Sequence, residues 1–131
     1  MATEMVYKGK TLEELQSLSV ADFSKLTNSR ARRSIKRGFE NSRKDLLLKI
    51  EKFKKGLTKK PVKTHCRGQI ILPNMLGLTI HVYSGKAFSP VIIQPEMLGR
   101  YLGEFVHTRS KIQHSAPGLG ATKSSGVKAK K

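Results

Sequence analysis

The spacing of apolar and polar residues divides the chain into a helical first half and a second half with strand periodicity. Thr11 followed by Glu14, and Ser19 followed by Asp22, are capping-box patterns that begin short helices. Gly38 lies in the next helical stretch, which is strongly basic, and we expect the helix to kink or break there. Apolar residues recur along this stretch at the intervals of one helix face, namely Ile35, Phe39, Leu46, Ile50 and Phe53.

The period changes to two in the second half of the chain. Apolar and polar residues alternate across 78–83, as in a half-buried strand, and the Ser-Gly-Lys turn at 84–86 leads to a second strand at 88–94. A strand within 62–72 would precede both, and a helix would begin at Pro95. The pattern predicts an α+β fold, with basic N-terminal helices, a small three-stranded antiparallel sheet, a C-terminal helix and an extended basic tail.

The net charge of +17 is unevenly spread over the 131 residues. It amounts to −2 in residues 1–24, +13 in 25–67, zero in 68–104 and +6 in 105–131. Apolar residues concentrate in the neutral block, which indicates a compact core between two basic extensions. The predicted parts of the chain are an N-terminal helical basic extension at 1–58, an α+β core domain at 59–108 and a flexible basic C-terminal tail at 109–131.

Composition argues against several classes of protein. The longest apolar stretch, 70–83, is interrupted by Pro, Asn, Gly and His and is too short to span a bilayer. Residues 1–5 lack the basic and apolar blocks of a signal peptide. The single cysteine, Cys66, excludes an intramolecular disulfide and is typical of a reducing compartment. We therefore expect a soluble intracellular protein.

The sequence predicts no catalytic residue, no cofactor and no metal site. The segment 118–125 resembles part of a phosphate loop, but Thr122 stands where that motif requires glycine. His65 and Cys66 are adjacent, yet the other histidines lack the paired spacing of a structural zinc site. We therefore predict that the protein is not an enzyme.

The basic block at 25–67 predicts binding to a polyanion, chiefly nucleic acid. Its sixteen bases face only three acids, so most of them lack an intramolecular partner and repel one another. A solvated helical face is the ordinary alternative, and a membrane surface is a weaker one because the apolar stripe is narrow and Trp is absent. Charge alone does not distinguish DNA from RNA.

The neutral block carries a more specific pattern. It opens with Lys59-Lys-Pro-Val-Lys-Thr-His and continues with Ile71-Leu-Pro-Asn-Met-Leu-Gly-Leu-Thr-Ile. At fixed intervals there follow Ser84-Gly-Lys, Ile93, Leu98-Gly, Leu102-Gly-Glu-Phe and Thr108. This region resembles the universal small-subunit ribosomal protein nineteen family, whose eukaryotic members are called protein fifteen. The archaeal and eukaryotic branch is indicated by Arg30-Ala-Arg-Arg-Ser-Ile-Lys-Arg-Gly and by the tail from His114.

The resemblance implies a structural, RNA-binding constituent of the cytoplasmic ribosome that supports translation and subunit assembly. It implies contact with small-subunit ribosomal RNA in the head and with ribosomal protein thirteen, close to tRNA and the intersubunit bridge. A general, chromatin-type DNA-binding protein is the alternative. The exposed face of Thr79, His81 and Tyr83 is a further candidate surface for a partner or RNA, and an ordinary polar surface is the alternative. The predicted RNA-binding residues are Arg30, Arg32, Arg33, Lys36, Arg37, Arg43, Lys44, Lys54, Lys55, Lys59, Lys60, Lys63, Arg67, Lys86, Arg100, Arg109, Lys111, His114 and Lys123.

Overall fold

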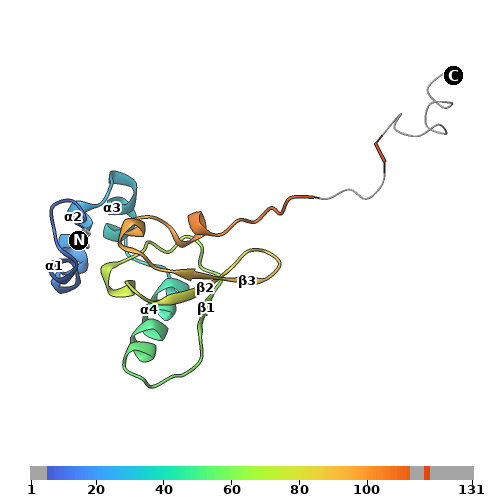
Figure 1. Cartoon of the computed structure of the whole chain (residues 1–131). Coiled ribbons are helices and arrows are strands. Elements are labelled where there is room, and N and C mark those ends of the chain that lie inside the picture. The colour runs from blue at the N-terminus through green and yellow to red at the C-terminus, as the bar shows by residue number, and fades with distance from the viewer. Residues whose placement is uncertain (1–5, 113–116, 119–131) are drawn as a thin grey trace, which may run out of the picture.

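A computed structural model describes residues 6–112 and 117–118 of the chain. Helices α1 to α3 lie together at one side of a small sheet, α4 lies below the sheet in this view, and residues 107–112 lead away from the body (Figure 1). In the described part of the chain, no helix combines the length and the apolar character needed to cross a membrane. The helices and strands are α1 (Leu12–Ser17), α2 (Val20–Leu26), α3 (Ser29–Lys36), α4 (Asn41–Lys54), β1 (Val62–Thr64), β2 (Thr79–Tyr83) and β3 (Phe88–Ile92).

Local capping signals set the boundaries of the helices. Thr11 and Glu14 form the predicted capping box at the start of α1, with each side chain accepting from the other residue's backbone N–H. The Ser19 hydroxyl oxygen accepts from the N–H of Asp22 at 3.1 Å and so caps α2. Gly38, at φ +82°, separates α3 from α4. The predicted break in the basic helical stretch is therefore confirmed.

One hydrophobic core joins the helices to the sheet. Leu46 and Ile50 of α4 are buried in the same cluster as Ile80 and Val82 of β2. The helices α1 and α2 add Leu15 and Phe23 to that cluster, and both side chains are fully buried. The predicted division at residue 58 therefore falls between α4 and β1, two elements that share this core.

The predicted α+β class is confirmed, but the prediction that all three strands run antiparallel is wrong. The central strand β2 pairs antiparallel with β3, and Tyr83 lies opposite Phe88. It pairs parallel with β1, and Val62 lies opposite Ile80. A parallel pair cannot be joined by a hairpin turn, and the chain makes the necessary crossover through residues 65–78. The strand expected around 62–72 is β1, which is only three residues long.

Two short 3-10 helices, η2 (Pro95–Met97) and η3 (Leu102–Phe105), replace the predicted C-terminal helix. Between them Leu98 has φ −57° and ψ 136°, and Gly99 has φ +75°. These angles are those of a type II β-turn, whose third residue is usually glycine because it needs positive φ. Apolar residues at helical spacing therefore flank a turn here.

The same turn occurs earlier in the chain, because the sequence Pro-x-Met-Leu-Gly stands at both 73–77 and 95–99. The earlier copy also begins with a 3-10 helix, η1 (Pro73–Met75), and also ends on a glycine at φ +75°. The two copies are bonded reciprocally. The N–H of each glycine donates to the carbonyl of the isoleucine that precedes the other copy, Gly77 to Ile93 and Gly99 to Ile71, both at 3.1 Å.

Candidate nucleic-acid interface

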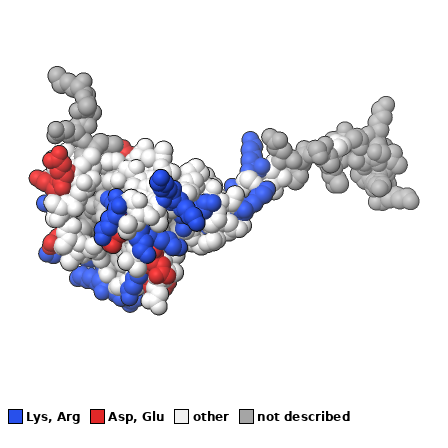
Figure 2. Space-filling model, turned by 90° about the horizontal axis from the view of Figure 1, so that it is seen from below, with Lys and Arg blue, Asp and Glu red and all other residues white. Residues whose placement is uncertain are grey.

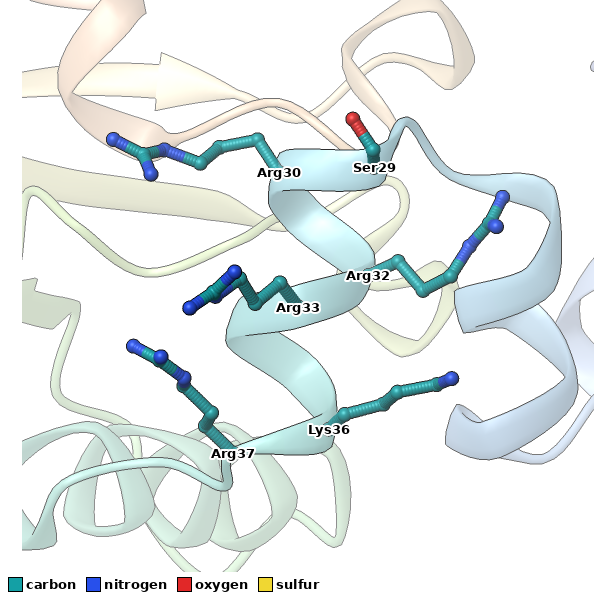
Figure 3. A pocket seen from close by; sticks show the side chains of 6 residues that line it. All are labelled: Ser29, Arg30, Arg32, Arg33, Lys36 and Arg37. Atoms are coloured by element: carbon teal, nitrogen blue, oxygen red, sulfur yellow. The ribbon is translucent and has the colours of Figure 1, made fainter.

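Helix α3 and its C-cap residue, Arg37, present three arginines on one side. Arg30, Arg33 and Arg37 follow one another at spacings of three and four, which align residues on one helix face, and all three are exposed. Figure 3 shows their guanidinium groups extending to the same side of α3. An open hollow along α3 is lined by these three arginines and also by Ser29, Arg32 and Lys36. We call these three residues the arginine face. In residues 6–112 and 117–118, ion pairs form at Lys25–Asp22 and Arg100–Glu104 and none involves the arginine face.

Arg32 and Lys36 point to the other side of α3 (Figure 3). The guanidinium of Arg32 donates to three backbone carbonyls at the end of α2, those of Ser24, Lys25 and Thr27, at 3.3, 3.1 and 3.1 Å. The last carbonyls of a helix have no intrahelical partner, and a cation beside them is favourable. Arg32, a predicted RNA-binding residue, is therefore engaged in capping α2.

Arg67 holds three segments of the protein together. Its Nη1 donates to the carbonyl of Tyr83 at 2.9 Å, and its Nη2 donates to the carbonyls of Gly103 and Val106, each at 2.7 Å. A Cβ on Gly103 would lie 2.9 Å from the Cβ of Arg67, so this glycine permits the close approach. The guanidinium of Arg67 is thus directed into the fold, although the residue is among those predicted to bind RNA.

A second basic surface lies between α4 and β1. Lys49 and Lys52 of α4 line a hollow with Lys60 and Lys63, and Pro61 and the edge of β1 complete it. We call these four residues the lysine groove. The predicted set contains Lys60 and Lys63 but not Lys49 and Lys52. Lys49 and Lys52 are three residues apart and so lie on one side of α4. The sequence does not show that this side faces β1, because that depends on the path of the chain after α4.

The other described members of the predicted set lie around these two surfaces. Figure 2 shows Lys and Arg side chains at several places on the face seen from below, with Asp and Glu side chains between some of them, and again along the C-terminal segment. Arg43 is half-buried, with its Nη2 3.1 Å from where a Cβ on Gly68 would be, and Arg100 approaches Glu104 at 3.9 Å. His114 and Lys123 lie outside the described residues. The remaining members are exposed, namely Lys44, Lys54, Lys55, Lys59, Lys86, Arg109 and Lys111.

A comparison with known protein families identifies the group to which this chain is related. Residues 33–114, more than half of the chain, match the family described as ribosomal protein S19. The chain belongs to the ribosomal protein S19 family. The predicted resemblance is therefore confirmed, and the S19 match begins within α3, well before the start of the neutral block. As an S19 family member, the chain is a structural constituent of the small ribosomal subunit and takes part in translation.

Proposed function

We propose that this S19 family protein binds small-subunit ribosomal RNA through its arginine face and its lysine groove. It does so in the head of the subunit, beside ribosomal protein thirteen and close to tRNA and the intersubunit bridge. Its work is structural and not enzymatic: on the cytoplasmic ribosome it supports subunit assembly and translation. The observation that carries the proposal is the arginine face, a row of three exposed guanidinium groups on a helix without any acidic residue.

The two basic surfaces suit different kinds of phosphate contact. A guanidinium is a planar fork that can bond two phosphate oxygens at once and can also stack on a base. Arginines aligned along α3 can therefore fix the direction of an RNA backbone. Lysine ammonium groups act as less directional point charges. The lysine groove can accordingly attract the backbone while allowing it to adjust.

Removal of the arginine face tests the proposal. The triple variant Arg30→Gln, Arg33→Gln, Arg37→Gln should bind a fragment of small-subunit head RNA more weakly. The slope of log K against log salt should become shallower by about 2 to 3, because each lost phosphate contact removes about 0.7 to 0.9. Filter binding over a range of potassium chloride concentrations measures both quantities.

The matched control removes the same charge elsewhere. Lys8→Gln, Lys10→Gln and Lys25→Gln lower the net charge equally, but they lie where the acids Glu13, Glu14 and Asp22 balance the bases. This control should leave the salt slope within about half a unit of that of the unaltered chain, since no row of phosphates is lost. Equal slopes for the two triple variants would show that only net charge matters and would refute a defined RNA surface.

The assembled state and the DNA alternative are tested separately. The full chain should sediment with small subunits through a moderately high-salt wash, whereas recovery only in free fractions would contradict the proposal. Duplex DNA should compete poorly for the bound head RNA. Comparable affinity and salt slope for duplex DNA would favour the general DNA-binding alternative, since non-specific binding depends chiefly on phosphate charge.

A further inference from the structure

Three rings form a cluster where β2 passes into β3. The ring centroid of Tyr83 lies 5.1 Å from that of its cross-strand partner Phe88. The ring of His65, just after β1, lies 4.6 Å from Tyr83 and 5.1 Å from Phe88. We call these residues the aromatic cluster. His65 is exposed and the other two are half-buried, so an external group can reach the rings.

The hydrophobic core does not account for this cluster. The other four phenylalanines of the chain either belong to the core or pack against it, but Phe88 does neither, and the same is true of Tyr83. Along β2 the residues Ile80 and Val82 are buried, while Tyr83 lies on the opposite face of the sheet. The cluster therefore occupies the outer face of the sheet, with its rings available to a ligand.

The charge around the cluster favours a nucleic acid over a protein. The ammonium of Lys63 lies 5.5 Å from the ring centroid of Phe88, as in a cation–π contact. The sequence has no Asp or Glu at any position from 52 to 95, a range that includes the whole sheet. One carboxylate, that of Asp45, lines the hollow beside His65, and it shares that hollow with Lys49 and Lys63.

We propose that the aromatic cluster stacks on an unpaired base of the bound RNA. This inference rests on the proposed function, because Lys63 belongs to the lysine groove and also contacts Phe88. An RNA backbone that lies along the lysine groove therefore passes beside the rings of the aromatic cluster. Aromatic side chains on an open sheet face can stack on bases of any identity, since every base has a π-face. A duplex hides these faces, so the occupant is a looped-out or single-stranded nucleotide.

Fluorescence of a base analogue tests the stacking. The full chain is titrated into a short single-stranded RNA that carries one 2-aminopurine, whose emission is quenched when it stacks. Tyr83→Leu and Phe88→Leu should each weaken binding by about 5- to 150-fold and reduce the quench, while the salt slope stays unchanged. Lys63→Met should instead lower the salt slope by about 0.7.

Two further variants separate stacking from folding. Phe53→Leu removes an aromatic ring that packs against the core from α4, so it should leave both affinity and quench unchanged. Phe88→Tyr keeps a ring in the cluster and should retain the binding that Phe88→Leu loses.

The results distinguish this inference from the function beneath it. Unchanged affinity and quench in both Tyr83→Leu and Phe88→Leu would overturn the stacking site while leaving phosphate binding in place. A protein would then be the alternative occupant of the outer face of the sheet. If the unaltered chain failed to bind head RNA, the proposed function itself would fail, and this inference with it.

Discussion

Arg67 offers the sharpest test of how the fold is held together. Arg67→Met keeps a side chain of similar length but removes the guanidinium that bonds the carbonyls of Tyr83, Gly103 and Val106. A hydrogen bond to a charged group contributes about 1.5 to 3 kcal/mol net. The simple total for three such bonds is too high, because water can reach the carbonyls of the half-buried Tyr83 and Gly103.

We therefore expect Arg67→Met to lower the free energy of unfolding by about 3 kcal/mol, a large part of the stability of a small domain. Arg67→Lys keeps the charge, but one ammonium cannot reach all three carbonyls, so about half of this loss should remain. Urea denaturation at constant ionic strength, followed by circular dichroism, gives the midpoint and slope from which the free energy is obtained.

The control for this experiment is Arg33→Met, which removes the same group from the exposed arginine face. Its effect on the free energy of unfolding should stay within about 0.5 kcal/mol, because the Arg33 side chain is exposed and its guanidinium donates no hydrogen bond within the described part of the protein. If Arg67→Met were no more destabilising than Arg33→Met, the view of Arg67 as an internal clasp would be refuted.

Two further predictions concern the contact between the N-terminal segment and the turn at Gly99. Gly99→Ala and Gly77→Ala both place a side chain at φ +75°, but only at Gly99 would the new Cβ meet other atoms, 3.1 Å from the Tyr7 hydroxyl oxygen. Urea denaturation should therefore show Gly99→Ala to be about 1 to 3 kcal/mol more destabilising, and equal losses would contradict this packing. Burial raises the pKa of Tyr7 above its ordinary value of 10.0, although Arg100 partly offsets the rise. The unfolded chain releases the phenol proton of Tyr7 at a lower pH than the folded chain does. The stability that Tyr7 contributes is therefore present below about pH 10 and is lost as the pH rises through the higher folded pKa. Thermal melts above about pH 10 should show a smaller fall in Tm for Tyr7→Phe than for the unaltered chain, and parallel plots of Tm against pH would disprove this.

The features predicted correctly from the sequence depend on neighbouring residues. A capping residue and its partner stand three positions apart, and a glycine such as Gly38 ends a helix through its own φ angle. Strand direction depends instead on distant partners. Periodicity marks which residues of β1 face the core, but it does not tell whether β1 runs with or against β2. In the same way, apolar spacing after Pro95 is shared by a helix and by a 3-10 turn.

The candidate interface shows the same division. The charge count along the sequence located the basic block and hence the arginine face, because charged residues remain exposed without depending on a particular tertiary contact. The charge count could not show that Arg32 and Arg67 donate their hydrogen bonds to backbone carbonyls, because these carbonyls belong to elements that are distant in the sequence or packed from another helix. Lys49 and Lys52 were missed for the converse reason. Their importance arises only when the turn after α4 brings Lys60 beside them.

The paired Pro-x-Met-Leu-Gly turns make the hairpin of β2 and β3 a closed unit. One turn precedes the hairpin and the other follows it. The N–H of Gly77 in the first turn donates to the carbonyl of Ile93 beside the second, and the N–H of Gly99 in the second donates to that of Ile71 beside the first. Neither turn can unfold without releasing a bond of its counterpart. These bonds close the open end of the hairpin like a clamp, and we expect the segment from Ile71 to Arg100 to unfold as one unit. The N-terminal segment adds to this clamp from outside, because Tyr7 and Thr27 lie against the turn at Gly99.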